Sequence, residues 1–241
     1  MTTAEADPTD ALSSVPAAGS RRARPVVGHV RFFHGPMDCG KSTLALQIDH
    51  NQTRQGRRGM LLTRHDRSGA PQISSRIGIV RDAVEVVGDA DLRTLVRARW
   101  STGRRVDYLV VDEAQFLSAG QVEQLAELAD DSQVDVFCFG IATDFRGRLF
   151  PGAQRLVELA DEVVPVQVQV LCWCGLEGRF NARVVDGRMA RSGDTVLVAD
   201  TTSTGPAGPV PDVRYQVLCR RHHRLGDLGP TVDEQDQLPL G

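Results

Sequence analysis

The amino-acid sequence predicts an α/β fold, in which a parallel sheet is flanked by helices and followed by a small C-terminal lobe. Three observations predict it. A glycine-rich loop at 35–42 lies between an apolar run and a helical segment, a second apolar run ends in Asp112 and Glu113, and two short clusters of cysteine and histidine begin at Cys172 and Cys219. The first two observations are typical of P-loop NTPase sheets, where ligands bind at the carboxyl ends of the strands.

The bulk properties exclude several classes of protein. The 241 residues allow one substantial domain with an appendage, and 41% hydrophobic residues, 24% charged residues and a net charge of -3 give no nucleic-acid footprint. No run of about 18 apolar residues predicts a membrane helix, and residues 1–25 lack a signal-peptide core. Five cysteines, an odd number, do not suggest a disulfide framework. We therefore expect a cytoplasmic protein that binds neither nucleic acid nor a membrane.

The glycine-rich loop is the clearest motif. Gly35-Pro-Met-Asp-Cys-Gly-Lys-Ser42 fits G-x-x-x-x-G-K-[ST]; it follows an expected strand at 26–33 and begins a helix expected to end near residue 55. Its backbone N–H groups and the helix N-terminus suit phosphate oxygens. Lys41, the only lysine in the sequence, would reach the β- and γ-phosphates, and Ser42 would bind Mg²⁺. The predicted ATP-binding residues are Gly35, Pro36, Met37, Asp38, Cys39, Gly40, Lys41, Ser42 and Thr43. The alternative is a chance glycine-rich turn.

Shorter elements follow this loop. We expect a strand at 60–63, a strand at 84–87 and a helix at 90–100, whose apolar residues have helical spacing. The polar segment 64–76 has neither a helical nor an alternating period, so we expect a long loop of the kind that often forms a functional flap.

The second strong element is the apolar run at 106–111, which is typical of a buried parallel strand. It ends in Asp112 and Glu113, at the edge of the sheet where the phosphate loop also lies. Asp112 would hold Mg²⁺, and Glu113 would take a proton from a nucleophile. The alternative is that both acids cap a helix that starts near Ser118.

The rest of the α/β domain alternates in the same way. We expect a helix at 121–129, a strand at 134–139, a helix at 153–160 and a strand from 163 to about 171. The loop at 140–152 contains Phe145 and Phe150, which either form a pocket floor beside the phosphate loop or anchor the core.

The C-terminal clusters suggest a metal site. Thiolate and imidazole are ligands that Zn²⁺ prefers, and Cys172, Cys174, Cys219 and His222 would make four of them. His223 is an alternative fourth ligand, and buried free cysteines with surface histidines are the alternative to a site. The expected organisation is a disordered tail at 1–25, a P-loop α/β domain at 26–171, a zinc-binding lobe at 172–224 and a flexible tail at 225–241.

Together these motifs resemble the type II thymidine kinases, the zinc-containing, tetrameric kinases of thymidine. The resemblance runs from about 27 to 224 and rests on the phosphate loop, 74–78, 112–116, 143–152 and the cysteine clusters. It implies transfer of the ATP γ-phosphoryl group to the thymidine 5′-hydroxyl, with Mg²⁺, a structural zinc and a homotetramer. It implies Glu113 as catalytic base and seven nucleoside-binding positions, which are Met37, Phe116, Ile141, Phe145, Val198, Ala199 and Tyr215.

Two features depart from the family pattern. The base-holding loop usually has Gly-Gly after an apolar run, whereas here Ala199 and Asp200 are followed by a Pro- and Gly-rich insertion at 201–211. The Cys172–Cys174 pair is also tighter than the usual spacing. The alternative function is a P-loop ATPase or nucleotide-sensing protein that has a zinc lobe and no nucleoside kinase activity.

Overall fold

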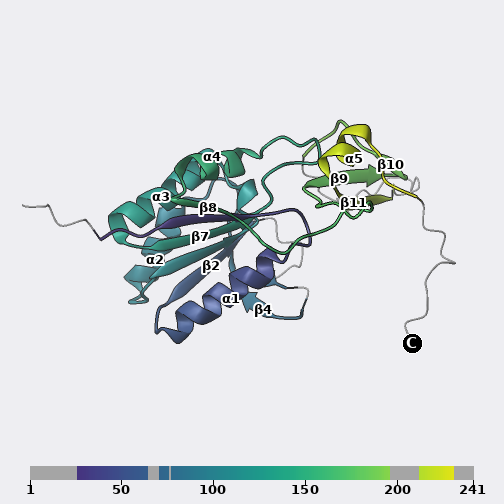
Figure 1. The fold of residues 1–241 in the computed structure, drawn as a ribbon. Helices are drawn as coiled ribbons and strands as arrows, with labels where there is room; N and C mark the ends of the chain where they lie inside the picture. The colour runs from purple at the N-terminus through teal and green to yellow at the C-terminus, as the bar shows by residue number, and fades with distance from the viewer. Residues whose placement is uncertain (1–25, 65–70, 76, 196–211, 231–241) are drawn as a thin grey trace, which may run out of the picture.

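The computed structural model describes residues 26–64, 71–75, 77–195 and 212–230. The central sheet is built from β1 (Val30–His34), β2 (Gly59–Thr63), β5 (Val84–Glu85), β6 (Tyr108–Asp112), β7 (Asp135–Gly140) and β8 (Glu162–Pro165). Its strands are parallel and lie in the order β5-β2-β6-β7-β1-β8. Figure 1 labels β2, β7 and β8 of this sheet. The parallel α/β sheet predicted from the sequence is therefore confirmed.

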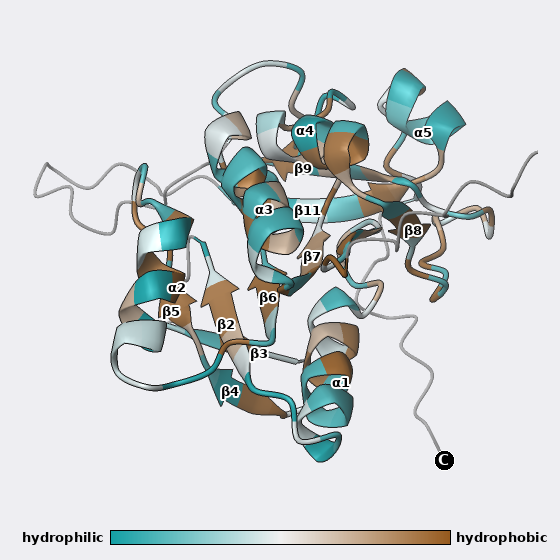
Figure 2. Cartoon of the chain, turned by 90° about the vertical axis from the view of Figure 1, so that its left-hand side faces the viewer, coloured by the Kyte–Doolittle hydropathy of each residue, from teal (hydrophilic) through white to brown (hydrophobic). Residues whose placement is uncertain are grey.

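Helices cover both faces of this sheet. α1 (Lys41–Arg54) lies on one face, and α2 (Leu92–Ser101), α3 (Ala119–Ser132) and α4 (Pro151–Leu159) lie on the other. Figure 2 shows the apolar strands enclosed between α1 and the pair α2 and α3. The arrangement is the three-layer sandwich in which parallel strands are buried on both faces.

Alternation along the strands divides the core into two clusters. In β6, Tyr108 and Val110 pack with α1, whereas Leu109 and Val111 pack with α2, α3 and α4. Successive side chains of a strand point to opposite faces, so a strand between two helical layers must be apolar at every position. The apolar run at 106–111 could therefore be recognised from the sequence as a buried parallel strand.

Local capping sets the helix starts. Asp91 accepts a hydrogen bond from the Thr94 N–H at 3.0 Å, and Ser118 forms a capping box with Gln121. Since Ser118 caps α3, the alternative that Asp112 and Glu113 cap this helix is wrong. α4 begins at Pro151, whose fixed φ suits a first helical position.

The expected strands differ most from the structure at three places. The first strand begins at Val30 rather than Val26, and β8, an edge strand that tolerates a proline, ends at Pro165 rather than near residue 171. Beyond it the chain leaves the sheet, and Val168 is exposed. The segment expected to be an irregular loop contains β3 (Gln72–Ser74), which pairs antiparallel with β4 (Val80–Asp82). Residues 65–70 and 76 of that segment lie outside the described residues.

The C-terminal lobe is a small antiparallel sheet with one short helix. β9 (Phe180–Val185) pairs with β10 (Arg188–Met189) and β11 (Val213–Leu218), and α5 (Arg220–Leu225) follows (Figure 1). The lobe continues past residue 224, because Leu228 packs on its core and the Asp227 carbonyl accepts a hydrogen bond from the Trp173 indole. The expected tails at 1–25 and 231–241 and the insertion at 201–211 lie outside the described residues.

No helix in the described ranges is both long and apolar enough to cross a membrane.

Candidate active site

The phosphate loop leads directly into α1. Gly40, the N-cap residue, has φ +81° and provides no side-chain cap for this 14-residue helix. The first N–H groups of the helix therefore lack the side-chain acceptor that most helices have, and they suit an anion. Glycine tolerates this left-handed conformation at little cost.

Lys41 lies over its own loop. Its Nζ donates hydrogen bonds to the Pro36 carbonyl at 2.7 Å and the Gly35 carbonyl at 3.3 Å. Burial, together with Arg179 and Lys41, lowers the pKa of neighbouring His34. Positive charge therefore gathers at the end of β1, where the predicted phosphate site lies.

Ser42 and Asp112 meet although 70 positions separate them. β7 lies between β1 and β6 in the sheet, and the Ser42 hydroxyl donates to Asp112 Oδ2 at 3.0 Å. Burial, and then the neighbouring charge of Glu113, raises the pKa of Asp112 to about 6. A buried carboxylate beside a hydroxyl supplies the hard oxygen ligands that Mg²⁺ prefers.

Glu113 follows at a bend in the chain. Its φ of +53° is unusual for a residue with a side chain. Gln115, 1% exposed, donates its amide N–H to the Glu113 carboxylate and accepts a hydrogen bond from the Ile141 N–H at 3.1 Å. Gln115 thus connects the predicted base to the end of β7. This glutamine was not predicted from the sequence, in which its only signal was its place two residues after Glu113.

The apolar positions of the predicted nucleoside site fall into two groups. Met37 and Phe116 pack against the larger core cluster, which includes Ile141 and Phe150. The Phe116 and Phe150 rings meet edge to face at 5.4 Å. Of the two aromatic residues in the 140–152 loop, Phe150 is therefore an anchor of the core and not part of a pocket floor.

Phe145 lies outside that cluster, in a loop organised by a buried carboxylate. Asp144, 3% exposed, accepts hydrogen bonds from the Arg146 and Arg148 N–H groups at 2.9 and 3.0 Å and pairs with the Arg146 guanidinium at 2.7 Å. The Phe145 ring is also buried, and the guanidinium of Arg183 lies 4.0 Å from its centre. This contact brings β9 of the lobe against the loop.

β9 also contacts the phosphate loop. Asn181, 3% exposed, accepts a hydrogen bond from the Met37 N–H at 2.7 Å. Arg183, two residues further along, donates to the Tyr215 hydroxyl at 3.1 Å. Neither Asn181 nor Arg183 was predicted, because the expected lobe was assigned no strands. Val198 and Ala199, the other two predicted nucleoside positions, lie outside the described residues.

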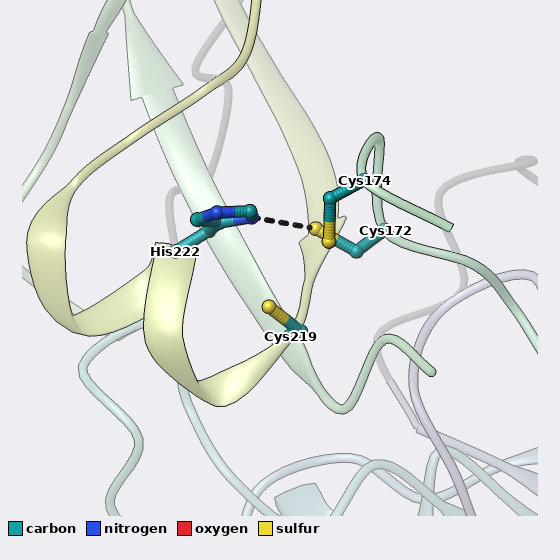
Figure 3. Close-up of side chains that lie close together, drawn as sticks. All are labelled: Cys172, Cys174, Cys219 and His222. Carbon is teal, nitrogen blue, oxygen red and sulfur yellow. Dashed lines mark hydrogen bonds between the residues drawn. The ribbon is translucent and has the colours of Figure 1, made fainter. Parts of the chain in front are cut away.

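The predicted metal ligands converge. The ligand atoms of Cys172, Cys174, Cys219 and His222 all lie within 4.8 Å of one another (Figure 3). Cys172 Sγ and His222 Nδ1 are 3.4 Å apart, close to the roughly 3.6 Å expected for two ligands of one tetrahedral zinc. A hydrogen bond from the backbone N–H of His222 lowers the pKa of the Cys219 thiol, which favours the thiolate form of that one ligand. The donor set fits a metal such as zinc.

The two adjacent histidines, His222 and His223, have different partners. His222 Nε2 faces Asp227 at 3.9 Å, as an outer carboxylate faces a metal-binding imidazole, and Trp173 stacks on its ring at 4.3 Å. His223 instead hydrogen-bonds the Phe145 carbonyl through Nε2 at 2.8 Å and stacks on Phe180. His223 therefore supports the loop that carries Phe145, and His222 is the histidine of the cluster.

A phosphate loop on β1, with Asp112 and Glu113 at the same sheet edge, defines an α/β protein of the P-loop NTPase type. The family model described as thymidine kinase matches residues 28–223. Thymidine kinases of Streptomyces coelicolor and Streptomyces avermitilis are 55% and 52% identical to this chain over 194 and 193 residues, covering 80% of it and 87% of each relative. That of Cutibacterium acnes is 52% identical over 208 residues, which cover 85% of this chain and 94% of the relative. The chain belongs to the thymidine kinase family.

Proposed function

We propose that this chain is an ATP-dependent thymidine kinase, which transfers the γ-phosphoryl group of ATP to the 5′-hydroxyl of thymidine and forms dTMP. The observation that carries the proposal is the hydrogen bond between Ser42 and Asp112, because it brings the phosphate loop and the acidic strand end to one place. Family membership, and the names of relatives that are more than half identical, support thymidine as the acceptor.

The chemistry follows from the charges at the sheet edge. Phosphoryl transfer depends mainly on positioning the reactants and neutralising developing charge. The N–H groups of the loop and Lys41 would bind the β- and γ-phosphates. Glu113, oriented by Gln115, would accept the proton that the 5′-hydroxyl loses as its oxygen attacks phosphorus.

The proposed enzyme would bind two kinds of metal ion, one at the phosphate site and one in the C-terminal lobe. Ser42 and Asp112 would hold Mg²⁺, which would neutralise charge on the bound phosphates. Zinc bound to the cysteine and histidine cluster would have a structural role, because four protein ligands leave no position open for a substrate.

The family resemblance further supports a homotetramer in the cytoplasm. Light scattering after size-exclusion chromatography tests the tetramer directly, since a monomer or dimer mass would reject it.

The test of the function is nucleoside-dependent ADP release. Protein, ATP and Mg²⁺ are incubated with thymidine, deoxyuridine, deoxycytidine, deoxyadenosine or no nucleoside, for the wild type and for Glu113→Gln. We expect turnover with thymidine that falls ~10²–10⁴-fold in the variant, the usual contribution of a general base, with ATP affinity unchanged. Equal rates with and without nucleoside would reject the kinase, and wild-type turnover in the variant would reject Glu113 as the base.

A further inference from the structure

One face of the lobe sheet points at the candidate active site. Asn181 and Arg183 alternate with Ala182 and Val184 along β9, and Tyr215 is the direct partner of Arg183 on β11. Ala182 packs in the core of the lobe, whereas Asn181 contacts the phosphate loop. Since residues two apart share a face of a strand, Arg183 lies on the same side as Asn181.

The buried side chain of Arg183 contacts three separate segments of the chain. It is 3% exposed and donates hydrogen bonds from Nε to the Tyr215 hydroxyl, from one terminal nitrogen to the Asp194 carbonyl at 2.7 Å and from the other to the Thr195 carbonyl at 3.0 Å. Its plane lies over the Phe145 ring at 4.0 Å. All three hydrogen-bond acceptors are neutral oxygens.

A buried cation is costly to desolvate, and neutral acceptors repay less of that cost than a carboxylate does. An apolar residue would fill the space without this penalty. The guanidinium instead fixes the relative positions of its partners, because its planar fork binds two carbonyls, a hydroxyl and an aromatic face in set directions at once. The three elements it connects are the Phe145 loop, β11 at Tyr215 and the chain at 194–195.

We propose that Arg183 is a positioning residue for the nucleoside: it holds Phe145 and Tyr215, two of the predicted nucleoside contacts, in one arrangement with the chain at 194–195. The inference rests on the proposed thymidine kinase function and deepens it. Arg183 acts on nucleoside binding, whereas the contact between β9 and the phosphate loop is made by Asn181, two residues earlier.

The test compares Arg183→Lys and Arg183→Met with the wild type in the ADP-release assay, varying thymidine and ATP separately. Lysine keeps the charge but cannot bridge both carbonyls and the hydroxyl while stacking on the ring. Because the groups that bind the nucleoside would be misplaced, we expect the KM for thymidine to rise about 10- to 100-fold in both variants. The KM for ATP should stay within about twofold of the wild-type value. The exposed Arg214, which neighbours Tyr215 on β11, provides the control: Arg214→Met should leave both KM values unchanged.

Folding is checked by zinc content and thermal unfolding of each variant. A folded Arg183→Lys enzyme whose KM for thymidine matches the wild type would overturn the inference, as would a fall in kcat alone. Failure of both variants to fold would overturn it too, because Arg183 would then serve only the stability of the lobe. Absence of thymidine turnover in the wild type is a separate result, which rejects the proposed function and this inference with it.

Discussion

Replacing Gln115 by leucine removes one amide that makes two contacts, and the structure predicts a separate effect for each. Its N–H group donates to the Glu113 carboxylate, and its oxygen accepts from the Ile141 N–H. A hydrogen bond to a charged group contributes about 1.5–3 kcal/mol, so kcat should fall about 10- to 150-fold if Glu113 is the base. The buried Ile141 N–H is left without an acceptor, which should lower the free energy of unfolding by about 1–3 kcal/mol.

The assay measures kcat at saturating thymidine and ATP, and denaturant unfolding of the same preparations. Gln124→Leu is the matched control, because the Gln124 side chain accepts a hydrogen bond from the Leu92 N–H at 2.8 Å, away from the sheet edge. It should lower stability by about 1 kcal/mol and leave kcat unchanged. A Gln115→Leu enzyme that is destabilised yet turns over at the wild-type rate would refute the reasoning. Equal losses of kcat in both variants would refute it too.

Four further substitutions test the phosphate loop, the metal cluster, the acidic strand end and a helix cap. Lys41→Ala should abolish thymidine phosphorylation, because no other lysine exists to bind the phosphates; retained ADP release would contradict it. Cys172→Ser should lower the zinc content, measured by atomic emission, and the unfolding temperature of the protein; a full zinc complement with an unchanged melting curve would be the opposing result. Asp112, whose folded pKa of about 6 exceeds its unfolded value, contributes stability at low pH that is lost as the pH rises from about 4 through 6. Without added divalent ions, the unfolding free energy of the wild type relative to Asp112→Asn should therefore fall by about 1–3 kcal/mol between pH 4 and 7, and a flat difference would be inconsistent with the raised pKa. Ser118→Ala should remove the capping box and cost about 1 kcal/mol in denaturant unfolding, whereas an unchanged midpoint would show that the cap is dispensable.

The central strands were predictable because burial on two faces leaves a simple pattern. β6 and β7 lie between helical layers, so Val110 and Val111 are both buried and the run is apolar throughout. The phosphate loop was predictable because its backbone conformation requires glycine, as Gly40 at φ +81° shows. Similarly, the cysteine and histidine cluster was recognisable from ligand chemistry alone.

The parts that sequence reasoning missed are those where tertiary contacts override the pattern. On β9 the polar residues Asn181 and Arg183 face the phosphate loop and Phe145 instead of solvent. The alternation of polar and apolar residues along this strand therefore does not show which face is exposed. β3 buries only Ile73 in a strand of three residues, too short to show a period. β8 was extended too far because valines beyond Pro165 suggested a strand, although Val168 is exposed.

The most direct test of the proposed reaction follows the phosphoryl group itself. ATP labelled with ³²P at the γ position is incubated with Mg²⁺ and the protein, together with thymidine, 3′-deoxythymidine or 5′-deoxythymidine, and the labelled products are separated. The proposed function predicts label in the monophosphates of the first two nucleosides and none in 5′-deoxythymidine, which has no 5′-hydroxyl. Labelled inorganic phosphate as the only product, or label transferred to 5′-deoxythymidine, would contradict it.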